Sequence, residues 1–123
     1  MKAWLLSLVL VITAGAVFAQ EAYTDEEIAE IAKDAGMAPD PLMVEGDIDY
    51  GEYLSGEWTT CHQLDGNFDG IPAITQWDAL FFKLAMHEYK MKSRENPVMQ
   101  MIAGRLNDEE IASLAAYFAQ IEQ

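Results

Sequence analysis

The feature of this sequence that most constrains its fold is the stretch G-E-W-T-T-C-H-Q at residues 56–63, which contains Cys61, the only cysteine of the chain. One cysteine cannot form an internal disulfide, so Cys61 pairs with another chain, remains a free thiol, or is occupied by a bound group. A domain this small without disulfides gains much from a prosthetic group that enlarges its core. This stretch therefore decides whether the chain folds around its own side chains alone or around a ligand.

Cys61 and His62 form the end of a C-x-x-C-H motif, in which two cysteine thioethers hold a haem and the histidine binds its iron. The first cysteine position is occupied by Trp58, so the motif reads W-T-T-C-H. His62 is the candidate proximal ligand because an imidazole nitrogen suits haem iron. Because a Cys-His pair alone is weak evidence, the hypothesis depends on the rest of the chain.

The first residues have the pattern of a secretory signal peptide. Lys2 precedes an apolar run from Ala3 to Ile12, and small residues continue to Ala19. The run is too short for a membrane span, so we expect cleavage before Gln20 and a periplasmic protein without a membrane span. An uncleaved anchor is the alternative. The predicted signal peptide is residues 1–19.

The charge of the chain restricts its partners. Asp and Glu number 21 against 7 Lys and Arg, which gives a formal net charge of −14. Such a charge argues against a nucleic-acid partner, because the phosphates would repel it. The same charge keeps a protein soluble, and it could equally steer this one towards a basic partner.

The N-terminal part of the mature chain predicts one helix and a linker. Thr24 and Glu27 form a capping box at the start of an apolar stripe with helical spacing, and Gly36 is a plausible stop. Residues 37–47 contain two prolines and a glycine, which is typical of a linker. We therefore expect residues 20–48 to be an N-terminal helix and linker.

Residues 49–123 predict a single, mostly α-helical domain, since no alternating run is long enough for a confident strand. A capping box at Asn107 makes the last helix the clearest element. The expected order is a short helix from Asp49 into the W-T-T-C-H stretch, a glycine-rich loop over 63–75, a helix over 76–92 with a wide apolar face, a methionine-rich loop or turn over 98–105, and the capped C-terminal helix.

A haem that only exchanges electrons needs a second axial ligand opposite His62. Met99 and Met101 are the candidates, because a thioether stabilises ferrous iron and raises its potential. Methionine is also a common filler of gaps in cores, and without the histidine motif both residues would be assigned to the core. His87 is the other candidate, but we expect it to be an ordinary surface histidine.

This order of elements resembles the class I cytochrome c family over about residues 49–123. Gly51 resembles the family's N-terminal helix glycine, which packs against the C-terminal helix near Tyr117. Pro72 resembles the proline whose carbonyl accepts the Nδ1–H of the haem histidine, a contact that fixes the tautomer. The resemblance implies a small helical domain around a haem.

The segment M-Q-M-I-A-G-R-L-N-D-E-E-I resembles the sixth-ligand region of the diheme branch of these cytochromes. In that alignment the iron ligand falls on Met99, and Met101 is a packing residue. The resemblance therefore implies His62 and Met99 as the two metal ligands.

Within the family, three segments most resemble the cytochrome subunit of flavocytochrome c sulfide dehydrogenase and related sulfur-oxidation cytochromes: G-E-Y-L-S-G-E-W-T-T-C-H-Q, I-P-A-I and Y-K-M-K-S-R-E-N-P-V-M-Q-M-I-A. This resemblance implies electron transfer, with a flavoprotein dehydrogenase or another redox protein as the partner that carries the catalysis. No nucleophile–base pair, phosphate loop or zinc cluster is visible in the sequence, so we expect no independent enzymatic activity.

Trp58 is the departure from the family pattern. It implies a haem c with a single covalent attachment, through Cys61, and an indole that packs on the porphyrin edge. The alternative is a degenerate cytochrome that has lost its haem and acts as an interaction subunit. A weaker hypothesis is a haem sensor or peroxidase-like protein, if Met99 dissociates readily.

Overall fold

The computed structural model describes residues 22–66 and 70–122, and within these ranges the chain is helical without any strand. The expectation of a mostly α-helical fold is confirmed. The expected signal peptide, residues 1–19, lies outside the described ranges. In the described part of the chain, no helix is both long and apolar enough to cross a membrane.

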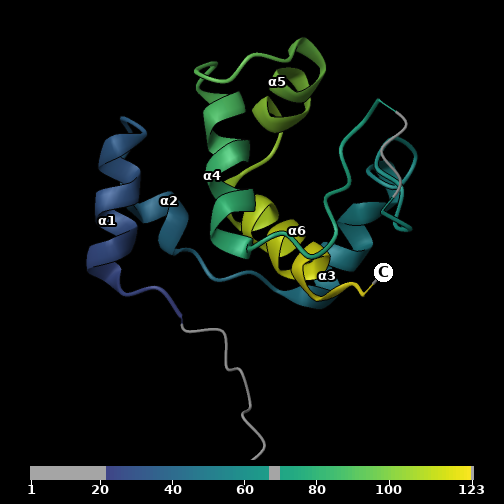
Figure 1. Ribbon diagram of the computed structural model, residues 1–123, viewed down its shortest axis with the longest axis horizontal. Helices are drawn as coiled ribbons and strands as arrows, with labels where there is room; N and C mark the ends of the chain where they lie inside the picture. Colours follow the sequence, from purple (N-terminus) through teal and green to yellow (C-terminus); the bar gives the residue numbers. More distant parts are fainter. Residues whose placement is uncertain (1–21, 67–69, 123) are drawn as a thin grey trace, which may run out of the picture.

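The described residues form six α-helices and one 3-10 helix, which are joined by turns and loops (Figure 1). In chain order they are α1 (Asp25–Asp34), α2 (Asp40–Met43), α3 (Ile48–Leu54), the 3-10 helix η1 (Ser55–Glu57), α4 (Ala79–Lys90), α5 (Pro97–Gly104) and α6 (Asp108–Gln120).

Both predicted capping boxes are confirmed. The Thr24 side chain accepts a hydrogen bond from the Glu27 backbone, and the Glu27 carboxylate accepts one from Thr24 N at 2.8 Å. Asn107 and Glu110 make the same reciprocal pair at the start of α6, both at 2.8 Å. These caps satisfy backbone N–H groups that the first turn of a helix leaves without a partner.

The main core lies between α4, α5 and α6, with the end of η1 against it. Its buried members are Trp58, Ile74, Phe82, Met86, Ala103, Ile111, Leu114, Ala115 and Phe118. Helix α3 crosses α6 at Gly51, where a Cβ atom would lie 2.0 Å from the carbonyl oxygen of Ser113 and 2.7 Å from Cβ of Tyr117. The expected contact of Gly51 with the C-terminal helix is therefore confirmed.

A second, smaller cluster joins α1 and α2 to the other side of α4. Ala32, Leu42 and Leu80 are its buried members. Figure 1 shows α2 between α1 and α4, with α5 and α6 on the far side of α4. The wide apolar face predicted for the helix over 76–92 is explained by this double contact, since α4 is buried on two sides.

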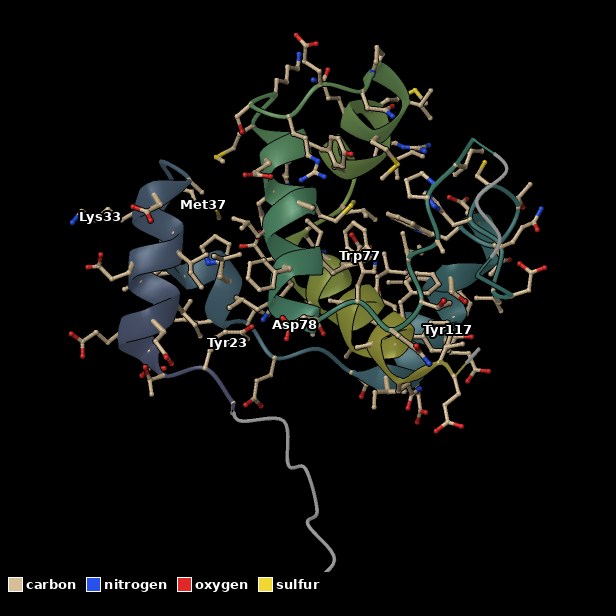
Figure 2. The ribbon with its side chains drawn as sticks, viewed as in Figure 1. Tyr23, Lys33, Met37, Trp77, Asp78 and Tyr117 are labelled. Atoms are coloured by element: carbon tan, nitrogen blue, oxygen red, sulfur yellow. The ribbon has the colours of Figure 1, made fainter. Side chains whose placement is uncertain are left out.

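Tyr23 adds a contact at the N-terminal end of α4. Its ring lies edge-on to Phe81 with centroids 6.2 Å apart, and its hydroxyl donates to Asp78 Oδ2 at 3.4 Å. Figure 2 shows Tyr23 and Asp78 near this end of the helix. The segment before α1 is thus attached to the same helix as the second cluster.

The methionine-rich segment was expected as a loop or turn, and this expectation is wrong because it forms α5. Asn96 caps the helix by accepting a hydrogen bond from Met99 N at 3.0 Å, and Pro97 occupies the first turn. Proline is favoured there, because its missing N–H would have no partner in a helix anyway.

Three other boundaries differ from the sequence-based expectation. The linker over 37–47 contains the one-turn helix α2, and α3 ends at Leu54, before the W-T-T-C-H stretch. Helix α4 begins at Ala79 rather than at residue 76, because the Asp78 carboxylate accepts hydrogen bonds from Leu80 N at 2.9 Å and Phe81 N at 3.3 Å. A side-chain oxygen at this position fixes the helix start.

Candidate functional site

Residues 58–62 form a single tight turn that continues from η1. Trp58 O accepts hydrogen bonds from Cys61 N at 3.1 Å and from His62 N at 2.7 Å. The turn leaves Cys61 exposed and buries His62, whose exposed fraction is 7%. The only thiol and the imidazole are therefore adjacent in the chain but differ in their access to solvent.

The imidazole of His62 is oriented by the loop that follows it. His62 Nδ1 lies 2.7 Å from the carbonyl oxygen of Pro72. A carbonyl oxygen can only accept, so Nδ1 carries the proton and donates it, which leaves Nε2 unprotonated in the neutral ring. The hydrogen bond that the family resemblance implied between His62 and Pro72 is confirmed, and it leaves Nε2 as the ring nitrogen that could bind a metal.

A cavity of about 260 Å³ brings the proposed site residues together. Cys61, His62, Met99, Trp58 and Pro72 all line it. Most of the remaining wall is apolar, with contributions from Ile71, Ile74, Trp77, Phe82, Met86 and Ile102. Apolar walls with a few polar groups are typical of sites for small ligands and cofactors.

Met99 reaches this cavity from the first turn of α5. The Asn96 cap and Pro97 place it there, and Met99 is partly buried against the main core. Met101 was expected to be a packing residue, but its exposed fraction is 60% and it is absent from the cavity wall. The structure therefore separates the two candidate methionines clearly, and only Met99 lies at the site.

Met86 also lines the cavity, and the sequence did not single it out as a candidate ligand. It lies on α4 with an exposed fraction of 3% and belongs to the main core. The only available signal was its position on one apolar face with Phe82 and Tyr89, which equally indicates simple packing. The cavity thus contains a second thioether.

Trp58 occupies the inner end of the turn rather than its surface. Its exposed fraction is 6%, and its ring contacts His62, Phe82 and Phe118 at centroid distances of 5.9, 5.9 and 6.1 Å. The residue at the missing cysteine position is therefore part of the main core as well as of the cavity wall.

Comparison with known proteins gives one partial similarity. The chain is 35% identical over 60 residues to the thiosulfate dehydrogenase electron acceptor of Stutzerimonas stutzeri (strain A1501). The matched part is 46% of this chain but only 28% of the length of that curated relative. No protein-family model matches the chain.

His87 lies outside the cavity, and its expected surface position is wrong. Its exposed fraction is 4%, because α4 is buried on both sides. His87 Nε2 lies 4.0 Å from Asp108 Oδ1 and, within the described residues, has no hydrogen-bond partner. Burial lowers the pKa of His87 below its usual 6.5, and the Asp108 carboxylate opposes this only in part.

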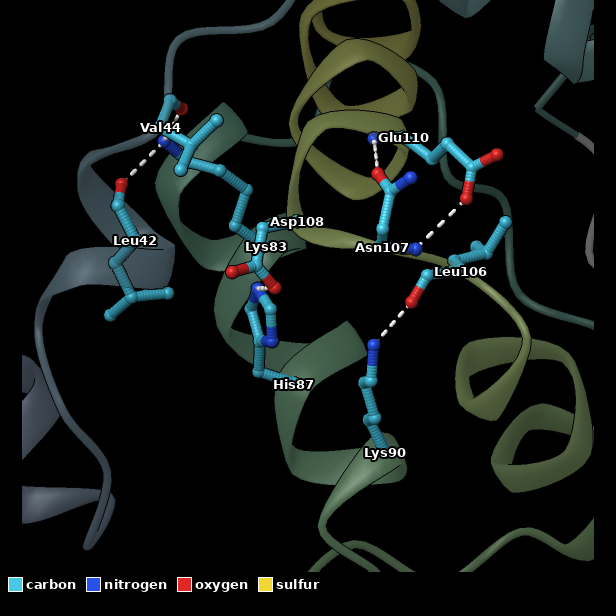
Figure 3. A network of polar contacts seen from close by, with 9 residues as sticks. All are labelled: Leu42, Val44, Lys83, His87, Lys90, Leu106, Asn107, Asp108 and Glu110. Carbon is cyan, nitrogen blue, oxygen red and sulfur yellow. Dashed lines mark hydrogen bonds and ion pairs between the residues drawn. The ribbon is translucent and has the colours of Figure 1, made fainter.

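His87 belongs to a row of polar side chains that tie α4 to its neighbours (Figure 3). One turn earlier, Lys83 Nζ donates to the carbonyl oxygens of Leu42 at 2.6 Å and Val44 at 3.1 Å. Near the end of the helix, Lys90 Nζ donates to the carbonyl oxygen of Leu106. These contacts are structural, because they fix the segments that lead into α3 and α6.

The described residues offer no alternative metal centre. Within ranges 22–66 and 70–122, no group of three or more His, Cys, Asp or Glu side chains is arranged to hold a metal ion. The groups of the cavity wall that could bind a metal or cofactor include one imidazole, one thiol and two thioethers, and the side chains of Glu57, Tyr89 and Asn96 also line the cavity. An imidazole and thioethers in mostly apolar surroundings can bind a large apolar cofactor with a metal centre.

Proposed function

We propose that the protein is a periplasmic monohaem c-type cytochrome that transfers electrons in a sulfur-oxidation system. Cys61 would hold the haem through a single thioether, and His62 and Met99 would be its axial ligands. The observation that carries this proposal is the common cavity, which brings the thiol and imidazole of the turn and the thioether of Met99 on α5 into one largely apolar site.

The residues present fit a haem in three respects. The His62 ring has its Nδ1 proton on Pro72 O, so Nε2 is the nitrogen available to iron. Met99 lies on the wall of the same cavity, on a different helix from His62. Cys61 is next to the imidazole and exposed, which suits a thiol that must react with a cofactor edge.

A bound haem would supply reversible one-electron exchange between ferric and ferrous iron. If His62 and Met99 both held the iron, they would leave no position on it for a substrate. The apolar wall would limit the access of water to the cofactor, which helps to set its potential. These features support an electron carrier rather than an enzyme.

The partner follows from the family resemblance and from the relative's name. The Stutzerimonas protein is named as an electron acceptor of thiosulfate dehydrogenase, and the sequence resembles cytochrome subunits that serve a flavoprotein. We infer a flavoprotein dehydrogenase or another redox protein of sulfur oxidation as partner, with the catalysis on its side. The formal net charge of −14 would steer the chain towards a partner with a basic docking surface.

An absorption spectrum of the purified exported protein tests the proposal. We expect low-spin cytochrome bands and a pyridine haemochrome spectrum shifted to the red, as one thioether instead of two would give. A colourless protein with a free Cys61 thiol would refute the electron carrier. If that colourless protein co-purified with a flavoprotein, it would instead be a haem-free interaction subunit.

Carbon monoxide separates the carrier from a sensor or a peroxidase-like protein. Because Met99 would occupy the sixth position, we expect the ferrous form not to bind carbon monoxide at neutral pH. Ready binding would show that Met99 dissociates, and would exclude a closed electron carrier.

A further inference from the structure

Trp58 contacts the proposed iron ligand directly. The Trp58 and His62 rings have centroids 5.9 Å apart and planes inclined by 28°. His62 N donates to Trp58 O at 2.7 Å, so the two residues are one helical turn apart. Side chains at this spacing lie on the same side of a turn. The residue that replaces the first cysteine therefore packs on the imidazole.

The position of Trp58 is fixed by the core on its other sides. Its indole packs at tilted angles against Phe82 of α4 and Phe118 of α6, which themselves contact each other at 5.9 Å. Interiors are packed so closely that a large ring in such a cluster has a single orientation. The surface that Trp58 presents to His62 is thus set by two helices.

We propose that Trp58 is a positioning residue for His62. Pro72 fixes which nitrogen of His62 carries the proton, and Trp58 fixes the plane of the ring. A cysteine at position 58 would hold the cofactor itself, whereas the tryptophan holds the side chain that binds it. This role rests on the proposed function as a haem electron carrier, and it explains how one thioether can suffice.

The test uses three variants of the full chain. Trp58→Leu removes the ring that packs on His62, and Trp58→Phe keeps an aromatic ring there. Phe118→Leu is the matched control, because it removes an aromatic ring that has no ring contact with His62. In this variant Phe82 still packs on Trp58 and keeps the indole against His62. If Trp58→Leu does not fold, Trp58→Met allows the same comparison, because its unbranched side chain adapts better to an irregular gap.

The first readout is the nuclear magnetic resonance of the His62 ring. The chain has two histidines, so a His87→Gln background assigns the His62 signals without ambiguity. In the parent and in Trp58→Phe, we expect one tautomer, protonated at Nδ1, with ring-proton shifts displaced by the aromatic neighbour. In Trp58→Leu we expect this displacement to be lost and the ring-proton signals to broaden, because the plane of the ring is no longer held, while Nδ1 stays protonated against Pro72 O. Phe118→Leu should keep the parent pattern.

The second readout applies to the oxidised haem protein. The spread of the haem methyl signals reports the orientation of the axial imidazole plane, so it should change in Trp58→Leu and stay unchanged in Phe118→Leu. Parent-like His62 signals in Trp58→Leu, or an equal disturbance in Phe118→Leu, would overturn the positioning role. A colourless parent protein would instead remove the proposed function, and the His62 ring signals would still decide the role of Trp58.

Discussion

At the scale of single residues, two thioethers line the same cavity as His62, and the proposed function requires only one of them as an iron ligand. Met86 lies in the middle of α4 and belongs to the main core, whereas Met99 lies in the first turn of α5 and is partly buried. The chemistry of the two sulfur atoms is the same, so the position of each methionine in the fold must determine which of them is the iron ligand in the proposed function.

Replacing Met99 by leucine should therefore abolish the spectroscopic signature of a sulfur ligand in the oxidised protein, with little loss of fold stability. Met101→Leu is the matched control, and it should leave both the signature and the stability within about 0.5 kcal/mol, since its side chain is largely exposed. A lost signature in Met86→Leu, with Met99→Leu unchanged, would show that the ligand has been assigned to the wrong helix.

His87 makes the stability of the fold depend on pH. Its pKa is below 6.5 in the folded protein, chiefly because the ring is buried, although Asp108 favours the charged form. Below pH 6.5 the unfolded chain takes up a proton before the folded one does. Stability should therefore fall as pH decreases from about 6.5, by up to about 1.4 kcal/mol per pH unit until the folded pKa is reached.

The check is the free energy of unfolding between pH 7.5 and 5.5, measured for the parent protein and for His87→Gln. The variant should show a flatter pH dependence in this window, whatever its stability at pH 7.5. Equal slopes would mean that His87 is protonated equally in both states.

At the scale of elements, the crossing of α3 over α6 depends on the missing side chain of Gly51. Gly51→Ala would place Cβ 2.0 Å from the Ser113 carbonyl oxygen, which is backbone and cannot rotate away. We expect a loss of roughly 3 kcal/mol in unfolding free energy, at the upper end for overpacking. Gly56→Ala meets nothing within 4 Å and is the control in the same denaturation experiment.

An unchanged unfolding midpoint for Gly51→Ala would show that the two helices can separate without cost. Because α3 leads directly into η1 and the turn with Cys61 and His62, we also expect Gly51→Ala to alter the absorption of the haem protein. Gly56→Ala should not, although it is closer to the turn in the sequence.

Helix starts that are fixed by a local capping residue were predictable from the sequence. Thr24 and Asn107 start helices because their side chains satisfy backbone N–H groups within three residues, and this signal needs no tertiary information. Helix α5 was missed because Asn96-Pro97 indicates a break, and a break before a helix looks the same as one inside a loop.

The site was predictable only in part, because some of its residues belong to recognisable motifs and others depend on tertiary packing. His62 was found through the Cys-His motif and Pro72 through a resemblance to a family, and their hydrogen bond is present in the structure. Met86 and the burial of His87 could not be predicted, because both depend on what packs against α4. A helix that is buried on two sides has apolar residues around most of its circumference. Its sequence pattern therefore does not show that a histidine is buried or that a methionine lines a cavity.

At the scale of the whole molecule, the two hydrophobic clusters share only α4 among the helices. Leu42 is fully buried in the smaller cluster, whereas every buried member of the larger cluster comes from residues 58–118. Proteins open locally in cooperative units that follow such divisions. We therefore expect α1 and α2 to open at a lower free energy than the main core.

Leu42→Ala should weaken the smaller cluster by about 2–5 kcal/mol, the usual cost of truncating a buried leucine. Hydrogen exchange would show this as faster exchange of amides in α1 and α2, with the amides of α6 around Phe118 unchanged. Met43→Ala is the neighbouring control, since Met43 is exposed. This variant should leave amide exchange unchanged both in α1 and α2 and in α6. Equal acceleration in α6 would mean that the molecule opens as one unit.

This division has a practical consequence for attaching the molecule to surfaces. The outer side of α1, for example at Glu30, is exposed, and α1 contributes no residue to the wall of the cavity. A dye or an electrode linker placed there would be carried by the part of the fold that can loosen without disturbing the histidine and the two sulfur-bearing helices. The cavity with His62, Met86 and Met99 would then stay free of the attachment.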